Sequence, residues 1–472
     1  MADNNKHELV IIGAGPGGYR AAFMAADLGL KVTLIDPEIN PGGVCLYRGC
    51  IPTKALLHLA KIKKDAEEAD EIGLKFNTGK VNLDKVRSWK DEVVNKLTGG
   101  LGQLVKAHKI EYIRARAKFT GPNELKLQGE DLDKKRIKFQ NAIISAGAKP
   151  VTLASVDPQM KEIMNSEQAL ELNDIPEKLL IIGGGYIGLE MATIYKALGS
   201  EISIVELLDD FMPGIDKDLL REYKKANPDL FEDIFFETKV NKVEKQRRYL
   251  DVTFSSKEGK EFIKKYDKIL ISIGQKPNTE NLGLDKVSVD LDEKGFIKVD
   301  SSQQTSKEGI YAIGDISGPP LLAHKASYEG RVAAEAISGK KTANDARAIP
   351  AVVYTEPEIA TCGLSENEAK EKNINYKKVK FSWSASGRAG AMNEKRGFTK
   401  LLVDPESELI LGAGIVGKNA GDMISELVLA MEMGATAEDV ALTIHPHPTL
   451  SETIMEAAEL FYGHPTHIFA KK

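Results

Sequence analysis

Two cysteines, Cys45 and Cys50, stand five positions apart in the run GGVCLYRGCIPTK of residues 42–54. The residues that follow, ALLHLAKIKKDAEEA, combine strong helix formers with an apolar face at helical spacing, so a helix is expected to begin near Pro52. Cys50 then lies at or just before a helix N-terminus, where free N–H groups and the helix dipole favour a thiolate. A thiolate beside a second thiol can cycle between dithiol and disulfide, which favours a redox role.

Other roles for this cysteine pair are weaker. The chain has three cysteines, and no second Cys/His pair offers the spacing of a zinc site, so no metal is expected. A structural disulfide that closes so short a loop would add little stability to a chain of 472 residues. The third cysteine, Cys362, is expected to be a small buried hydrophobic residue.

A glycine pattern near the start of the chain recurs later with the same internal spacing. Each copy reads as an apolar strand, a glycine turn, an amphipathic helix, a second strand and a terminal acid. The glycines allow the backbone to approach a pyrophosphate at the helix N-terminus, and the acid can bind a ribose diol. The two copies therefore predict two dinucleotide sites. The residues are Gly13, Gly15, Gly18 and Asp36 in the first copy, and Gly183, Gly185, Gly188 and Glu206 in the second.

The residues after Glu206 bear on the choice of nicotinamide cofactor. Glu206 is followed by Leu207, Leu208, Asp209 and Asp210, and no Arg or Lys is close by in the sequence. These carboxylates would repel the 2′-phosphate of NADP. The second site is therefore expected to bind NAD.

A second group of reactive side chains stands near the end of the chain, in the run TIHPHPTLSE of residues 443–452. A carboxylate such as Glu452 can fix the tautomer of a histidine and raise its basicity. Taken alone, the run fits a proline-rich loop with solvated histidines equally well. Beside a redox pair a proton-transfer role is favoured, because oxidation of a dithiol releases protons that need an acceptor.

Composition and pattern indicate an intracellular enzyme of about three domains. The net charge of -5 gives no reason to expect a nucleic-acid partner, and no apolar run is long enough for a membrane helix. The short polar N-terminus lacks a targeting pattern, so a cytoplasmic location is expected. The expected elements are a helical insertion at 52–108, strands within 112–139, buried strands at 142–150, 268–278 and 305–315, a helix at 323–337, and a separate domain with an antiparallel sheet from Ile349.

GGVCLYRGCIPTK, AIGD at 312–315 and HPHPTLSE, in this order, resemble the signature of the pyridine nucleotide-disulfide oxidoreductase family, over essentially the whole chain. The resemblance implies an α/β fold with two Rossmann-like dinucleotide-binding domains plus a C-terminal α+β dimerisation domain. It implies an FAD-binding domain at 1–148 and 277–346, an NAD-binding domain at 149–276 and an interface domain at 347–472. The implied FAD-binding residues are Gly13, Gly15, Gly18, Asp36, Lys54, Gly147, Asp315 and Ala323, and the implied NAD-binding residues are Gly183, Gly185, Gly188, Glu206 and Gly274.

The resemblance is strongest to the members that oxidise dihydrolipoamide with NAD+ as acceptor. It implies that the catalytic residues are Cys45, Cys50, His447, Glu452, Lys54 and Glu190. Cys45 is the sulfur that the substrate attacks, and Cys50 faces the flavin. Lys54 lies near the flavin N5 and is paired with Glu190, whereas His445 is structural. Tyr186 is either a lid over the nicotinamide pocket or a packing residue.

The family also implies partners. His447 serves the disulfide of the other subunit, so a homodimer is expected. The substrate is carried by the lipoyl domain of an acyltransferase, in the core of a 2-oxo acid dehydrogenase complex. Tyr47 and Arg48 depart from the smaller or less charged residues usual in this loop: Tyr47 could alter substrate access, and Arg48 either lowers the thiolate pKa values or faces solvent.

Three alternatives are weaker on sequence. An NADPH-linked glutathione-type reductase should carry basic residues after Glu206, and a mercuric-reductase-like enzyme needs a C-terminal cysteine pair that the tail GHPTHIFAKK lacks. A flavoprotein kept only for docking would not need the redox pair and the histidine–carboxylate pair.

Overall fold

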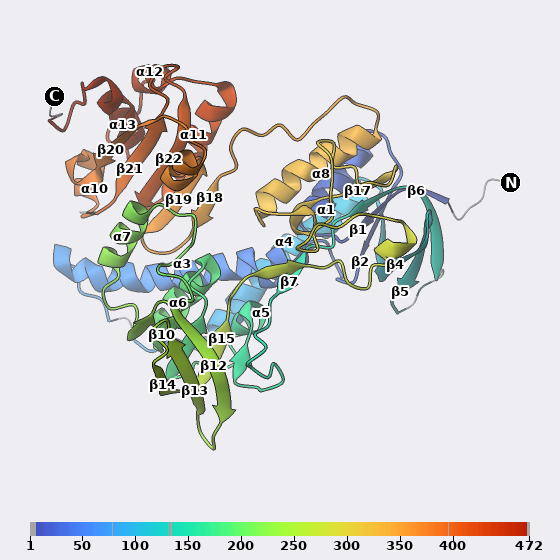
Figure 1. The fold of residues 1–472 in the computed structure, drawn as a ribbon, viewed down its shortest axis with the longest axis horizontal. Coiled ribbons are helices and arrows are strands. Elements are labelled where there is room, and N and C mark those ends of the chain that lie inside the picture. The colour runs from blue at the N-terminus through green and yellow to red at the C-terminus, as the bar shows by residue number, and fades with distance from the viewer. Residues whose placement is uncertain (1–5, 78, 131, 133–134, 395, 470–472) are drawn as a thin grey trace.

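The computed structural model describes residues 6–77, 79–130, 132, 135–394 and 396–469. Residues 1–5, part of the N-terminus on which the expectation about targeting rests, lie outside the described residues. Figure 1 shows three bodies: one around β1 and α8, one around α6 and β13, and one formed by the C-terminal quarter of the chain. The limits between the domains stay a prediction.

The first body is built on a seven-stranded sheet with the order β3-β2-β1-β6-β5-β4 and with β17 paired to β6. Strands β1, β2, β3, β6 and β17 run parallel, and apolar side chains such as Leu9, Ile11 and Leu34 are fully buried. Helices α1 and α8 pack side by side on this sheet (Figure 1). The elements are β1 (Lys6–Ile12), α1 (Pro16–Asp27), β2 (Val32–Asp36), β3 (Glu111–Arg114), β4 (Arg116–Gly121), β5 (Glu124–Gln128), β6 (Arg136–Ile144), β17 (Ile310–Ala312), η3 (Gly314–Ser317) and α8 (Ala323–Ile337).

Three predicted strands are shorter than expected. The prediction at 142–150 is divided between β6, which ends at Ile144, and β7 (Ala148–Pro150), and the prediction at 268–278 is divided between β15 (Lys268–Ile271) and β16 (Gln275–Pro277). The sequence predicts a strand over 305–315, but β17 ends at Ala312 and a 3₁₀ turn follows from Gly314. The N–H of Gly314 donates to a carboxylate oxygen of Glu329 at 2.7 Å, so it is taken out of the sheet by a side chain of α8. Helix α8 itself has the predicted limits.

The predicted helical insertion is confirmed, and two long helices, α3 and α4, make up most of it. Its elements are α2 (Gly43–Arg48), α3 (Cys50–Glu68), η1 (Ala69–Ile72) and α4 (Leu83–Ala107). Helix α4 starts where the Asn82 side chain accepts a hydrogen bond from the N–H of Lys85. Helix α3 begins at Cys50, which confirms the predicted position of this cysteine at a helix start.

The second body repeats the plan of the first. Its main sheet has the order β11-β10-β9-β15-β8 with parallel pairs, and a three-stranded antiparallel sheet β12-β13-β14 lies beside it. The short strands β7 and β16 pair where the chain enters and leaves this body. The elements are β7 (Ala148–Pro150), β8 (Ile163–Met164), α5 (Ser166–Ala169), β9 (Lys178–Ile182), α6 (Tyr186–Leu198), β10 (Glu201–Val205), α7 (Lys217–Ala226), β11 (Asp233–Phe235), β12 (Thr238–Lys245), β13 (Leu250–Ser256), β14 (Glu261–Tyr266), β15 (Lys268–Ile271) and β16 (Gln275–Pro277). The following 3₁₀ turn η2 (Leu284–Lys286) packs in the core of the first body.

The third body is an antiparallel sheet of order β18-β19-β22-β21-β20 covered by helices, as predicted from the change of pattern at Ile349. Its core includes Trp383, Ile415 and Cys362, which is buried as expected. The elements are β18 (Ala351–Val353), β19 (Glu358–Gly363), α9 (Glu366–Glu371), β20 (Lys377–Ser382), η4 (Trp383–Ala385), α10 (Gly387–Ala391), β21 (Phe398–Val403), β22 (Ile410–Gly417), α11 (Ala420–Met433), α12 (Ala437–Leu442) and α13 (Glu452–Tyr462).

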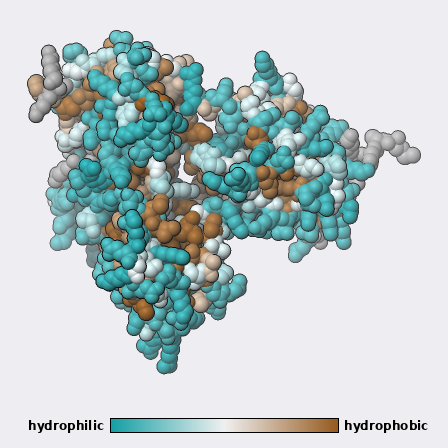
Figure 2. Space-filling view, viewed as in Figure 1, coloured by the Kyte–Doolittle hydropathy of each residue, from teal (hydrophilic) through white to brown (hydrophobic). Residues whose placement is uncertain are grey.

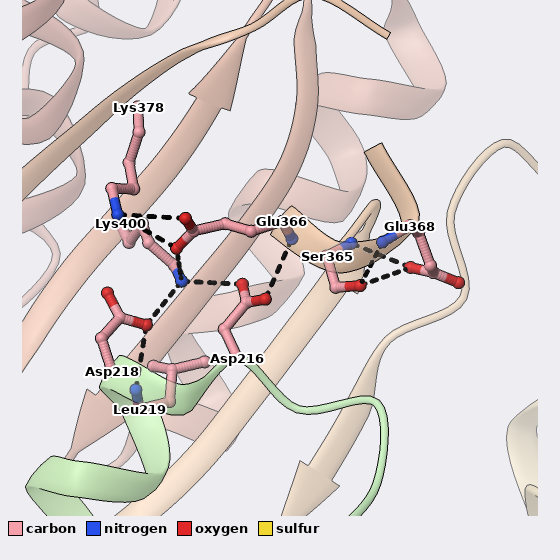
Figure 3. Close-up of polar contacts among 8 residues, drawn as sticks. All are labelled: Asp216, Asp218, Leu219, Ser365, Glu366, Glu368, Lys378 and Lys400. Atoms are coloured by element: carbon pink, nitrogen blue, oxygen red, sulfur yellow. Dashed lines mark hydrogen bonds and ion pairs between the residues drawn. The ribbon is translucent and has the colours of Figure 1, made fainter. Parts of the chain in front are cut away.

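A buried lysine joins the second and third bodies. Lys400 of β21 is 1% exposed, and its Nζ donates to Asp216 and Asp218 at 2.7 Å and to Glu366 at 3.0 Å (Figure 3). The same three carboxylates are spaced as metal ligands could be. The ammonium group already supplies the positive charge among them, so we assign this cluster to domain docking.

Among the described residues, none of the helices has both the length and the apolar character that a membrane crossing requires.

Candidate active site

A cavity of about 380 Å³ lies between the first and second bodies. On the face shown in Figure 2, apolar residues gather near the middle, where the bodies meet, and the rest of the surface is largely hydrophilic. The cavity brings together most residues that the sequence assigned to FAD and catalysis: Gly13, Gly15, Asp36, Cys45, Cys50, Lys54, Gly147, Glu190, Asp315 and Ala323. Tyr186, expected to be a nicotinamide lid or a packing residue, lines it too.

The glycine turn after β1 is held against the acid that ends β2. Oδ2 of Asp36 accepts a hydrogen bond from the N–H of Ala14 at 2.7 Å, and its Oδ1 accepts one from the N–H of Glu38 at 2.9 Å. Helix α1 follows with Pro16 in its first turn and no side-chain cap, so its N-terminal N–H groups stay available for an anion. Burial raises the pKa of Asp36, although these two hydrogen bonds oppose the shift.

Gly18 fits this turn for a steric reason. A Cβ at this position would lie 1.9 Å from the carbonyl oxygen of Gly13, so only glycine lets α1 approach β1 so closely. The equivalent Cβ at Gly188 would lie 2.2 Å from the carbonyl oxygen of Gly183. Both third glycines therefore serve helix–strand packing, and in the described chain neither lines the cavity.

The second glycine turn repeats the first. Oε2 of Glu206 accepts from the N–H of Gly184 at 2.7 Å, and its Oε1 accepts from the N–H of Leu208 at 2.9 Å. Gly185 is the N-cap of α6, again without a side-chain cap. Gly274 lies between β15 and β16, and its carbonyl oxygen accepts from the N–H of Val151 at 3.0 Å.

Two lysines that the sequence did not predict to lie here are close to Asp209 and Asp210, the acids after Glu206. Nζ of Lys217 lies 3.4 Å from Asp209, and Nζ of Lys224 lies 2.9 Å from both carboxylate oxygens of Asp210. Each lysine is paired with an acid. The loop is therefore less acidic than the sequence predicts, and Glu206, for which the described residues provide no ion pair, is the carboxylate left to repel a 2′-phosphate.

Asp315 and Ala323, at the beginning of η3 and α8, also line the cavity. Burial raises the pKa of Asp315, and Lys325 opposes this shift. Lys325 and Glu329 are both buried and lie 2.9 Å apart on successive turns of α8. Their contacts with Gly314 hold the η3 turn, a role that the Lys–Glu spacing in HKASYEG could have suggested.

The cysteines stand on two consecutive helices, the short α2 and the longer α3. Cys45 is inside α2, and Cys50 opens α3 and is exposed to the cavity. A hydrogen bond from Cys45 lowers the pKa of Cys50 to about 7, although burial opposes the shift, and the charge of Lys54 adds to the lowering. The same hydrogen bond, with burial, raises the pKa of Cys45. The pair is therefore asymmetric, with the thiolate favoured at Cys50.

Lys54 and Glu190 form the ion pair that the resemblance implies. Nζ of Lys54 lies 3.0 Å from each carboxylate oxygen of Glu190, which comes from α6 of the second body and is 3% exposed. A residue that sequence reasoning missed completes the group. The N–H of Tyr354 donates to Oε1 of Glu190 at 3.1 Å, and its ring centroid lies 4.5 Å from Nζ of Lys54.

His447 and Glu452 are paired on the third body. Nδ1 of His447 donates to Oε1 of Glu452 at 2.8 Å, and the ring is 71% exposed. His447 does not line the cavity of its own chain. His445 differs, since Nδ1 contacts the carbonyl oxygen of Thr443 at 2.8 Å and Nε2 contacts Glu426 at 2.6 Å, which fits the structural role expected for it.

The unusual pair Tyr47 and Arg48 is tied to its surroundings. The Tyr47 hydroxyl donates to the carbonyl oxygen of Asn40 at 3.0 Å. Arg48 pairs with Glu38 at 2.7 Å and with Glu167 of α5 at 3.3 Å. Its charge is therefore directed to two carboxylates, and the side chain links the redox loop to the second body.

These residues fit FAD and NAD. The middle glycine of each turn borders open space, since a Cβ at Gly15 would meet its nearest atom at 3.9 Å and one at Gly185 would meet nothing within 4 Å, so a pyrophosphate has room to approach. Each terminal acid is already oriented by backbone N–H groups. The cavity joins the first turn to the cysteine pair, as a cofactor with an adenosine at one end and a redox ring at the other requires.

Comparisons with known proteins agree with this geometry. Residues 7–330 match the family described as pyridine nucleotide-disulphide oxidoreductase, and residues 349–458 match its dimerisation domain, which indicates a homodimer. A dihydrolipoyl dehydrogenase from Vibrio cholerae is 47% identical over 463 residues, covering 98% of this chain and 97% of that relative. The dihydrolipoyl dehydrogenase of Bacillus subtilis is 44% identical over 98% of this chain and 97% of its own length.

Solved structures are similar over nearly the whole chain. LpdA from Mycobacterium tuberculosis superimposes with a TM-score of 0.88 at 25% identity, covering 96% of this chain and 99% of that one. The flavoprotein disulfide reductase RclA from Escherichia coli gives a TM-score of 0.85 at 26% identity, covering 96% and 100%. The chain therefore belongs to the pyridine nucleotide-disulphide oxidoreductase family, and it is a flavoprotein oxidoreductase that uses FAD and NAD.

Proposed function

We propose that the protein oxidises dihydrolipoamide to lipoamide with NAD+ as acceptor, through a disulfide between Cys45 and Cys50. One observation carries the proposal: a single cavity is lined by the first glycine turn, the cysteine pair and the Lys54–Glu190 pair. The relatives named dihydrolipoyl dehydrogenase supply the substrate class.

The thiol chemistry needs a base and two unlike sulfurs. His447 of the partner subunit takes a proton from one substrate thiol, and the resulting thiolate attacks the sulfur of Cys45. The disulfide breaks and Cys50 leaves as a thiolate, in keeping with its lowered pKa of about 7. The second substrate thiol then displaces Cys45, which closes the substrate disulfide and leaves the protein as a dithiol.

Bound FAD would supply the two-electron chemistry that links oxidation of the dithiol to reduction of NAD+. The overall reaction converts dihydrolipoamide and NAD+ to lipoamide, NADH and one proton. In this proposal Lys54 and Glu190 hold a fixed charge beside Cys50, Asp36 binds the ribose of FAD, and Asp315 and Ala323 bind at its flavin end. Glu206 and its glycine turn hold NAD.

The exposed position of His447 supports a role across a subunit boundary, because it does not line the cavity of its own chain. The substrate in this proposal is carried on the lipoyl domain of an acyltransferase, in a 2-oxo acid dehydrogenase complex. The proposal places the reaction in the cytoplasm, where thiols are kept reduced.

Anaerobic titration with dihydrolipoamide, followed by visible absorption, tests the proposal. We expect a long-wavelength band from the Cys50 thiolate against oxidised flavin, then NADH after NAD+ is added and no NADPH after NADP+. A flavin spectrum that ignores dihydrolipoamide but responds to NADH would contradict the substrate.

A further inference from the structure

Three parts of the chain meet at the ammonium group of Lys54, whose charge lowers the pKa of Cys50. Lys54 belongs to α3, Glu190 to α6 of the second body, and Tyr354 to the connection between β18 and β19 of the dimerisation domain. Figure 1 shows α3 running between α6 and the connection from β18 to β19. The dimerisation domain is thus in contact with both members of the ion pair.

Tyr354 restrains the pair in two ways. Its backbone N–H donates a hydrogen bond to Oε1 of Glu190 at 3.1 Å. Its ring faces the ammonium of Lys54, and Nζ lies 4.5 Å from the ring centroid. A cation over an aromatic face contributes about 0.5–2 kcal/mol, more when water is excluded. Glu190 is nearly buried, whereas about a third of the Lys54 side chain is exposed. Lys54 is therefore the member of the pair that can move, and the ring limits its motion.

The position of Lys54 matters because of what else faces Cys50. Lys54 lowers the pKa of Cys50 and Glu190 raises it. Among the described residues, the other titratable groups that interact electrostatically with Cys50 include Cys45, Tyr19 of α1, Tyr186 of α6 and Tyr354. Among these named groups Lys54 alone is a cation. A small displacement of the Lys54 ammonium would therefore change the pKa of Cys50.

We propose that Tyr354 is a positioning residue for the Lys54–Glu190 pair, through which the dimerisation domain sets the charge that Cys50 faces. The proposal rests on the function proposed above. It makes the ring of Tyr354 the important part, since the backbone N–H survives every substitution except proline. The hydroxyl group is dispensable.

The test uses the FAD-loaded Cys45→Ser protein, in which Cys50 has no disulfide partner. The long-wavelength absorption of its thiolate against oxidised flavin is titrated with pH. We expect Tyr354→Leu to raise the midpoint by about one pH unit, as for a nearby charge that is partly lost. Tyr354→Phe, which keeps the ring, should leave the midpoint in place.

A matched control is Tyr249→Leu. Tyr249 also carries a lysine over its ring, with Lys265 Nζ at 4.4 Å, but it lies in the second body, in the turn between β12 and β13. It should not shift the midpoint. If Tyr354→Leu loses FAD, Tyr354→Met, which fills similar volume without an aromatic face, takes its place with the same expectation.

Two results would overturn the proposal. One is an unshifted midpoint in the leucine or methionine variant with FAD retained, and the other is a phenylalanine variant that shifts as much as the leucine variant. Absence of the long-wavelength band at every pH in the Cys45→Ser parent would overturn the proposed function as well, because that function places Cys50 against the flavin.

Discussion

Nδ1 of His447 lies 2.8 Å from Oε1 of Glu452, and the other oxygen of that carboxylate accepts the N–H of Thr449 at 2.7 Å. Burial raises the pKa of Glu452, but these hydrogen bonds outweigh it and the pKa is lowered. The carboxylate therefore stays ionised at neutral and mildly acidic pH, and it fixes the ring so that Nε2 is directed away from the pair. This is the arrangement that a base needs when its substrate comes from outside its own chain.

Replacing the histidine should separate the two halves of the reaction. In His447→Gln, we expect dihydrolipoamide turnover to fall by about 10²–10⁴-fold, the usual contribution of a general base. FAD content and NADH-driven dye reduction should persist, because neither needs the base. His464→Gln is the matched control, since His464 is exposed near the same end of the chain. Near-normal turnover in the first variant would remove His447 from the mechanism.

The hydrogen bond between the cysteines should control the acidity of Cys50. The pKa of Cys50 is lowered first by Cys45, so Cys45→Ala should raise it by about one unit or more, while Cys45→Ser keeps a donor and should raise it less. The pH dependence of iodoacetamide alkylation at Cys50, with peptides identified by mass spectrometry, measures this. Cys362 provides an internal reference because burial raises its pKa to about 12. Equal pKa values of Cys50 in Cys45→Ala and Cys45→Ser would contradict the idea that the hydrogen bond from residue 45 lowers this pKa.

Glu206 should discriminate against NADP. Removing its charge in Glu206→Ser should improve kcat/KM for NADP+ relative to NAD+ by about tenfold, the effect of roughly 1.4 kcal/mol. Glu201→Ser serves as control, because Glu201 lies on β10, the strand immediately before Glu206, and, among the described residues, forms an ion pair with the exposed Lys178 at 3.5 Å. An unchanged ratio would show that other groups exclude the 2′-phosphate.

Lys400 should stabilise the docking of the second and third bodies. Lys400→Met leaves three carboxylates around an uncharged side chain and should cost about 3–5 kcal/mol of unfolding free energy, as for a broken buried pair. Lys378→Met, which removes a half-exposed partner of Glu366, should cost at most ~1 kcal/mol. Denaturant unfolding of the two variants side by side tests the difference. Similar small losses would contradict a structural role for the buried ammonium.

The same cluster predicts acid sensitivity. Burial raises the pKa values of Asp218 and Glu366, but Lys400 outweighs burial and both pKa values are lowered. The stabilisation is therefore fully present above the ordinary carboxylate pKa values and is lost as the pH falls through the lowered ones. Thermal melts across the acidic range should show this loss in the parent protein. In Lys400→Met the loss should be smaller, since the cation that favours the charged forms is gone.

Much of this site could be predicted because its signals are local. The glycine turns, their terminal acids and the position of Cys50 at a helix start each depend on residues that are neighbours in sequence. Asp36 and Glu206 bind the backbone of their own turns in the same way, so one pattern predicts both.

The remaining contacts depend on how the bodies dock. Glu190 is 136 residues from Lys54 and Asp216 is 184 residues from Lys400. No local pattern in the tripeptide around Tyr354 indicates that its ring will meet a lysine of α3. The pairing of Lys54 with Glu190 was accessible only through the family resemblance, and the contacts of Tyr354, Arg48 and Lys400 required the structure.

Helix α3 has a consequence for any attempt to study the redox pair by itself. Cys50 is its first residue, Lys54 is one turn later, and Lys61 and Lys63 further along contact Glu356 and the carbonyl oxygen of Ala197. One rigid element thus carries the reactive sulfur at its start and contacts with two other domains along its length. A synthetic peptide of residues 42–68 would keep both cysteines and Lys54, yet it would lack Glu190 and Tyr354, which hold Lys54 in place. We expect its thiols to have the pKa values of thiols in a flexible chain.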